Sequence, residues 1–165
     1  MIVLGIDPGM AETGYGVIVV EGSRMRAGDH GVVVTEAREA AAARLAEIHD
    51  RMAELVARHA PDSAALEDLY VGANPRTILS VGQARGAVLA ACGAAGLDAA
   101  GYPPAEVKKA VCGFGRADKG QMTRMVSAIL ALDVTPATDH AADALAVAVC
   151  HATRSRVTLR PAVAR

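Results

Sequence analysis

The beginning of the chain is a nearly continuous apolar run, residues 2–7, that ends in an aspartate, Asp7. A run without polar alternation is typical of a strand buried on both faces, so the sheet that contains it is covered on both sides. Pro8 and Gly9 end the run, because proline cannot donate to a strand ladder and glycine permits an unusual turn. The sequence therefore predicts a central strand that carries a carboxylate at its carboxyl end.

The remaining pattern predicts one mixed sheet covered by helices. Short turns join two further strands to the first one, and the apolar period becomes helical at residue 39. We predict strands at 2–7, 14–20, within 24–34, 63–69 and 97–102, and helices at 39–59, 75–95, 103–111, 119–132 and 139–153. The fold class is thus α/β, with a mixed five-stranded sheet whose first three strands are antiparallel and which is flanked by helices.

Length and composition limit the class of protein. The chain has 165 residues, of which 52% are hydrophobic and 21% are charged, and its net charge is −1. These values fit one globular domain and argue against disorder and against a polycation. We expect a domain over residues 1–154 and a basic C-terminal tail over 155–165. The sequence has neither an apolar run of the about 18 residues that a membrane span needs nor a secretory signal at its start, which predicts a cytoplasmic protein.

Acidic residues lie at the predicted edge of the sheet at which α/β proteins bind their ligands. Asp7 and Glu67 lie at the carboxyl ends of two predicted strands, the edge at which α/β sheets collect their ligands. In the last predicted helix, Asp143 follows His140 by three residues and Asp139 by four, so it shares a face with each of them. Asp139 also suits the N-terminal cap of that helix or an acidic position in its first turn, and we favour capping over metal ligation for it.

Carboxylates that converge from two strands and a helix suit hard divalent cations such as Mg²⁺ and Mn²⁺. Two such ions, about 3.5–4 Å apart, stabilise the attacking and leaving oxygens of an in-line phosphoryl displacement. A phosphodiester substrate also accounts for the three lysines, Lys108, Lys109 and Lys119, which all lie in the second half of the chain. The pattern therefore favours a metal-dependent nuclease without a membrane partner.

Five motifs occur together in the order in which a known family has them. They are Gly5–Gly9, Thr13–Gly16, Leu66-Glu67, Gly82–Gly86 and Ala141–Ala146. Over essentially the whole chain they resemble the RuvC family of bacterial Holliday junction resolvases. The resemblance implies an RNase H-like fold, a homodimer, and paired symmetric metal-dependent nicks in four-way junction DNA that leave 5′-phosphate and 3′-hydroxyl ends. It also implies a role in homologous recombination and DNA repair, with branch-migration proteins of the RuvA and RuvB type as partners.

The same resemblance assigns the acidic residues to metal binding and catalysis. Asp7, Glu67 and Asp143 match the acidic positions of the family, and His140 stands where many members have aspartate and some have histidine. We expect two ions in each active site, either Mg²⁺ or Mn²⁺. Because imidazole is a softer ligand than carboxylate, His140 predicts a preference for Mn²⁺.

The resemblance also assigns DNA contacts. Tyr70 matches an aromatic residue that stacks on or wedges junction bases, and Arg76 follows it in a predicted DNA-reading loop, where it meets phosphate. Lys108 and Lys119 match lysines near the scissile DNA, and we expect Lys108 close enough to aid catalysis. The helix predicted at 75–95 resembles the dimer interface of the family, since its small residues allow a close approach of two helices.

Three other functions fit parts of the pattern. An Asp-x-Gly turn between the first two strands also occurs in actin-type and sugar-kinase ATPases, but nothing after residue 100 supplies their second lobe. YqgF-like RNA-processing nucleases share the first motif and the fold, although the segment at 82–86 favours a resolvase. A non-catalytic junction-binding module is the third alternative, and the complete acidic set argues against it.

Overall fold

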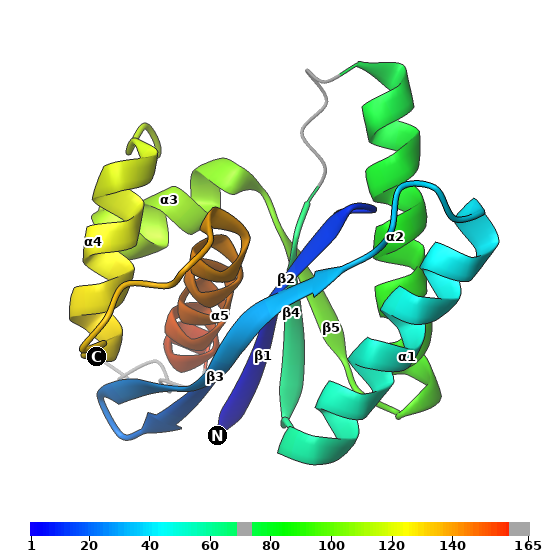
Figure 1. Cartoon of the computed structure of the whole chain (residues 1–165). Helices are drawn as coiled ribbons and strands as arrows, with labels where there is room; N and C mark the ends of the chain where they lie inside the picture. The colour runs from blue at the N-terminus through cyan, green and yellow to red at the C-terminus, as the bar shows by residue number, and fades with distance from the viewer. Residues whose placement is uncertain (69–73, 159–165) are drawn as a thin grey trace.

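The computed structural model describes residues 1–68 and 74–158, with side chains as far as Ser155. In these residues five strands form one sheet: β1 (Ile2–Asp7), β2 (Glu12–Glu21), β3 (Arg24–Val34), β4 (Ser63–Glu67) and β5 (Ala99–Tyr102). Their order is β3-β2-β1-β4-β5 (Figure 1). The pairs β1–β2 and β2–β3 are antiparallel, whereas β4 is parallel to both β1 and β5. The predicted fold class is confirmed.

Helices cover both faces of the sheet, as the buried first strand required. On one face lie α1 (Ala41–His59) and α2 (Pro75–Ala94), and on the other lie α3 (Pro104–Cys112), α4 (Lys119–Leu130) and α5 (Asp139–Thr158) (Figure 1). Because of these two layers, Val3, Leu4 and Ile6 of β1 have no exposed surface. No helix within the described ranges has the length and hydropathy that crossing a membrane requires.

Several boundaries differ from the prediction by one to five residues, and three of them are informative. β2 begins at Glu12 rather than at residue 14, because Glu12 and Thr13 already pair with the end of β3. β4 ends at Glu67 rather than at residue 69. α5 continues to Thr158 instead of ending at residue 153, and Ala152 near that end is fully buried. Packing against neighbouring elements therefore makes β2 and α5 longer than their local sequence pattern predicts.

Alternation along the strands decides which way the acidic side chains point. Val3 belongs to the core between the sheet and α3, α4 and α5, whereas Leu4 belongs to the core between the sheet and α1 and α2. Successive side chains of a strand point to opposite faces, so Asp7 lies on the same face as Val3. In β4, Ala65 belongs to the α5 side as well. Glu67, two residues later, therefore lies on the face that α5 covers.

Glycines on β1 and β2 let α5 lie directly on the sheet. A Cβ atom at Gly5 would overlap the carbonyl oxygen of Ala144, and one at Gly14 would overlap the carbonyl oxygen of His140. The helix also contributes small side chains, because Ala144 and Ala148 are fully buried. The first turns of α5 are thereby held against the ends of β1 and β2.

Replacing Gly5 by alanine tests this close packing. The added methyl group would overlap backbone atoms of α5, which have no rotamer to change, so we expect the unfolding free energy to fall by about 3 kcal/mol. Gly93→Ala is the matched control: it lies within α2, its added carbon meets nothing within 4 Å, and a gain of about 0.5–1 kcal/mol is expected. Urea unfolding followed by circular dichroism measures both. A Gly5→Ala protein as stable as the wild type would contradict the packing.

Candidate active site

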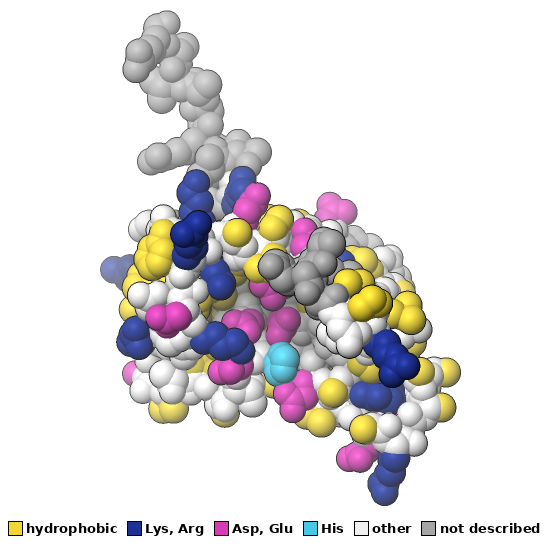
Figure 2. Space-filling view, turned by 90° about the horizontal axis from the view of Figure 1, so that it is seen from above, with side chains coloured by type: hydrophobic (Ala, Val, Ile, Leu, Met, Phe, Trp, Pro, Cys, Tyr) yellow, Lys and Arg dark blue, Asp and Glu magenta, His cyan; other side chains and the backbone are white. Residues whose placement is uncertain are grey.

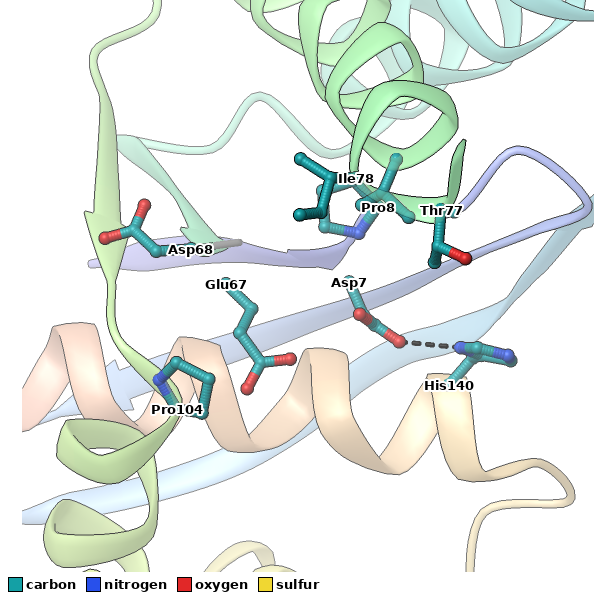
Figure 3. A pocket seen from close by; sticks show the side chains of 10 residues that line it. Asp7, Pro8, Glu67, Asp68, Thr77, Ile78, Pro104 and His140 are labelled. Carbon is teal, nitrogen blue, oxygen red and sulfur yellow. Dashed lines mark hydrogen bonds and ion pairs between the residues drawn. The ribbon is translucent and has the colours of Figure 1, made fainter. Parts of the chain in front are cut away.

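The ends of β1 and β4 place two carboxylates side by side. The strands are parallel, with Ile6 paired to Leu66, so Asp7 and Glu67 are the next residues of the two strands. Figure 3 shows the carboxyl groups of Asp7 and Glu67 on the same side, towards α5, while Asp68 points the other way. The rim predicted from the strand ends therefore holds both acids.

The first turns of α5 add a histidine and a third acid. Nδ1 of His140 lies 2.6 Å from Oδ2 of Asp7 (Figure 3), and Asp143 follows three residues later on the same face of the helix. The hydroxyl of Thr138 accepts a hydrogen bond from the backbone N–H of Ala141 at 3.2 Å and so caps the helix. The cap fixes where the helix begins, and with it the place where His140 meets Asp7.

Two adjoining hollows share Glu67 and Pro104. The first extends towards α2, where Ile78 and Val81 form an apolar wall. The second extends towards α3 and α4, and its charged lining residues are Glu67, Lys108, Lys119 and Asp143. Figure 2 shows acidic side chains around a histidine in the middle of this face, with basic side chains next to the acidic ones on the left of the view and others at the lower right. The acids thus lie between an apolar wall and a basic one, an arrangement that suits an anionic substrate held beside cations.

Asp7, Glu67 and Asp143, here called the acidic cluster, are electrostatically coupled. Burial, together with the charges of Asp7 and Asp143, raises the pKa of Glu67 to about 7. Burial and the charge of Asp7 also raise the pKa of Asp143 above its ordinary value. Lys108 and Lys119 oppose the shift at Glu67 without cancelling it. Because like charges repel one another in a partly buried site, a bound cation would stabilise the ionised cluster.

Asp139 holds Lys119 at the edge of the site. Nζ of Lys119 lies 3.0 Å from Oδ2 of Asp139, and this hydrogen bond raises the pKa of Lys119, so the amine stays charged. The helix cap is Thr138, so of the two positions that the sequence allowed for Asp139, cap or first turn, the structure has the first turn. Asp139 remains an acidic residue of the first turn, where its charge favours the N-terminal end of the helix dipole.

Arg85 of α2 fixes the end of β4. Its Nη1 donates to the main-chain carbonyl of Glu67 at 2.8 Å, and its Nη2 lies 2.9 Å from Oδ1 of Asp68. Gly101 leaves room for this pair, because a Cβ atom there would press on both Asp68 and Arg85. Sequence reasoning placed Arg85 in a family motif without a role. Its contacts tie α2 to the strand that carries Glu67.

The family described as "Crossover junction endodeoxyribonuclease RuvC" matches residues 3–151, a span that includes the whole acidic cluster and His140. The chain belongs to the RuvC family. RuvC of Moorella thermoacetica is 49% identical over 152 residues, which cover 92% of this chain and 91% of that protein.

Two solved structures of Thermus thermophilus RuvC share the fold. The first is 39% identical, covers 96% of this chain and 97% of its own, and superposes with a TM-score of 0.90. The second, described as a complex with Holliday junction substrate, is 37% identical, covers 95% and 96%, and has a TM-score of 0.88. The likeness confirms the RNase H-like fold of the RuvC family, and the family match sets aside the ATPase and the YqgF-like nuclease.

RuvC proteins depend on a divalent metal ion, and the residues at this rim fit one by donor type. The carboxylates of the acidic cluster are the oxygen ligands that Mg²⁺ and Mn²⁺ prefer, and His140 adds a nitrogen. Within the described ranges no three His, Cys, Asp or Glu side chains are spaced as a metal site, and Asp7 and His140 contact each other directly. Metal binding is therefore expected to rearrange that contact.

The structure describes three of the four residues that the sequence analysis predicted to contact DNA. Lys108 and Lys119 line the hollow that contains Glu67. Arg76 is exposed in the first turn of α2, where its backbone N–H donates to the side chain of Asn74 at 2.8 Å. Tyr70 lies outside the described residues. The fold thus brings the two lysines to the acidic cluster and leaves Arg76 on an exposed helix end.

Sequence reasoning also missed Glu12, which lies beside His140. Its Oε2 lies 3.3 Å from Nε2 of His140. No motif spacing points to this contact, because it depends on the start of β2 lying beside the first turn of α5.

Glu67→Gln is expected to stabilise the metal-free protein. A carboxyl group whose pKa is about 7 in the folded state, against an ordinary value of 4.5, disfavours folding progressively as pH rises between these values, and the loss persists above pH 7. Removing the charge should therefore raise the unfolding free energy by on the order of 2 kcal/mol at about pH 8 and by little at about pH 4.

Urea unfolding in EDTA at the two pH values measures this difference. Glu47→Gln, at an exposed position of α1, is the control and should change stability little at either pH. A stabilisation by Glu67→Gln that is the same at both pH values would contradict the raised pKa.

Proposed function

We propose that this chain is a crossover junction endodeoxyribonuclease that resolves Holliday junctions in homologous recombination and DNA repair. The observation that carries the proposal is the meeting of Asp7, Glu67 and Asp143 at one rim of the sheet, beside lysines, in a chain of the RuvC family. The Thermus thermophilus RuvC described in complex with Holliday junction substrate covers 95% of this chain, which supports the same substrate here.

The metal site that we propose consists of Asp7, Glu67, His140 and Asp143, with two Mg²⁺ or Mn²⁺ ions in each active site. Such ions lower the pKa of a bound water and stabilise charge on the phosphoryl oxygens. The raised pKa values of Glu67 and Asp143 support the assignment, because burial and the repulsion between the carboxylates outweigh the positive charges that face them, and a bound cation would offset both effects. Both must lose their protons before they bind an ion.

Lys108 and Lys119 bind the phosphodiester in this proposal. Both line the second hollow together with Glu67 and Asp143, so a phosphate held by the lysines lies next to the acids. Lys108, which is partly buried, is the closer candidate for stabilising charge on the cleaved phosphate. Water is the attacking group, which predicts 5′-phosphate and 3′-hydroxyl products. Tyr70 is proposed to stack on junction bases and Arg76 to contact phosphate.

The proposal includes a homodimer that forms through α2. Leu79 and Leu89 of this helix are large apolar residues with 65% and 38% of their surface exposed, which supports a covered face. The two cut strands of a four-way junction are related by symmetry, and a two-fold dimer presents two active sites related in the same way. Branch-migration proteins of the RuvA and RuvB type are the proposed partners, and the cytoplasm is the proposed location.

Cleavage of a synthetic four-way junction tests the function. We expect paired symmetric nicks in the junction with Mn²⁺, none in linear duplex or single strands, and none in EDTA. Asp7→Asn should lower cleavage by at least about 100-fold, because an acid of the metal site is lost, while junction binding is retained. Gel assays of cleavage and binding on the same substrates measure both.

Three outcomes of that experiment would contradict the proposal. Binding of the junction without cleavage would identify a non-catalytic module. Preferential cleavage of structured RNA would favour the other nuclease class considered from the sequence. Unchanged cleavage by Asp7→Asn would place the reaction elsewhere in the protein.

The proposed ligand His140 predicts a choice between metals. Because an imidazole nitrogen favours Mn²⁺ over Mg²⁺ more than a carboxylate does, junction cleavage at saturating metal should be faster with Mn²⁺. His140→Asp should lower the ratio of the two rates by bringing the Mg²⁺ rate closer to the Mn²⁺ rate. Single-turnover rates with each metal measure this ratio, and equal rates in the wild-type protein would contradict the prediction.

A further inference from the structure

Glu12 has no part in the proposed reaction, yet it lies against a proposed metal ligand. Its Oε2 is 3.3 Å from Nε2 of His140, while Nδ1 of the same ring is 2.6 Å from Oδ2 of Asp7. The imidazole therefore stands between two carboxylates. The side chain of Asp7 is 16% exposed and that of Glu12 is 47% exposed, so Glu12 is the outer of the two.

The backbone around Glu12 is held in place by its neighbours. Thr13 is fully buried, and its hydroxyl donates to the carbonyl of Gly9 at 2.7 Å. A Cβ atom at Gly9 would overlap the main-chain carbonyl of Glu12, so the turn closes tightly. Gly14 then lies against the carbonyl of His140. These contacts fix the start of β2 beside the first turn of α5, and they bring Glu12 to the outer edge of the imidazole.

Histidines that bind a metal through one ring nitrogen usually donate the other N–H to a carboxylate or a carbonyl, which fixes the ring and its tautomer. We propose that Glu12 is a positioning residue for His140: its carboxylate accepts the Nε2 proton and leaves Nδ1, the nitrogen that faces Asp7, to bind the metal. This inference rests on the proposed function, since it takes His140 as a ligand. Glu12 itself stays outside the coordination sphere.

The Mn²⁺ affinity of the DNA-free protein tests this inference without any turnover. Free Mn²⁺ has a distinct electron paramagnetic resonance signal, and its loss on titration with protein reports binding. Glu12→Ala should weaken Mn²⁺ binding about 10-fold, the lower end of what loss of such an outer partner causes. Glu12→Gln removes the same charge but keeps an oxygen that accepts the Nε2 proton, so its loss should be smaller, about 3-fold.

Glu21→Ala is the matched control. Glu21 is the last residue of β2, at the opposite end of the strand from Glu12, and both are exposed. Its removal subtracts the same charge from the protein far from His140, and the Mn²⁺ affinity should not change. Melting temperatures equal to that of the wild type show that the variants of Glu12 and Glu21 are folded.

Repeating Glu12→Ala in a protein that lacks His140 separates positioning of the ring from an effect of the Glu12 charge. In a His140→Asp protein there is no ring to hold, so adding Glu12→Ala should change the Mn²⁺ affinity by less than about 2-fold. An equal loss in both backgrounds would overturn the inference, because Glu12 would then act as a direct ligand or by its charge alone. Equal losses in Glu12→Ala and Glu12→Gln would overturn it for the same reason.

Junction cleavage by the wild-type protein separates this inference from the proposed function. If the wild type nicks four-way junctions with Mn²⁺ while Glu12→Ala binds Mn²⁺ as tightly as the wild type, only the role of Glu12 is overturned. If the wild type neither binds Mn²⁺ nor cuts the junction, the proposed function and the inference fail together.

Discussion

The candidate site depends on how closely α5 lies on the sheet. Gly5 and Gly14 offer no side chain between the strands and the helix, so the main-chain carbonyls of Ala144 and His140 lie directly against them. The contact of 2.6 Å between His140 and Asp7 has little tolerance, because a hydrogen bond is lost when its atoms separate by a further ångström. A bulkier residue in this seam would therefore displace the whole first turn of α5 from the strand ends. Stability of the layer and geometry of the site are set by the same small residues.

Burial of the acidic cluster favours cation binding but lowers the stability of the metal-free fold. Glu67 and Asp143 lie where solvent is partly excluded, which raises the pKa of each and disfavours their ionised forms. The same exclusion of water strengthens the attraction between these carboxylates and a divalent cation. Lys108 and Lys119 offset only part of the repulsion, and they stand on the side where a phosphate would neutralise them. The carboxylates and the lysines of the second hollow would thus each gain a partner of opposite charge only when both a cation and an anion are bound.

The sequence predicted those parts of the site that depend on local pattern. Asp7 and Glu67 were found because a carboxylate that ends an apolar strand is unusual, and strand alternation then accounts for their shared face. The sequence left Asp139 as the cap of α5 or as an acid of its first turn, because Thr138 and Asp139 are both good caps; the hydrogen bond of Thr138 and the ion pair of Asp139 with a lysine decide for the first turn. The contacts of Arg85 and Glu12 were not predictable, because each joins elements far apart in the chain.

The pairing of His140 with Glu12 bears on how a histidine can stand in place of a carboxylate among the proposed metal ligands. An imidazole that binds a metal through one nitrogen is neutral, so replacing a carboxylate by it removes one negative charge from the ligands of a divalent cation. In the proposal, the carboxylate of Glu12, 3.3 Å from Nε2, offsets this loss by fixing the ring and its tautomer rather than by its charge. The histidine presents a softer donor atom to the metal than an aspartate would. Affinity for the cation and selectivity between cations would then depend on different residues, Glu12 for the first and His140 for the second. A chain with the histidine alone would keep the selectivity and bind the ion more weakly.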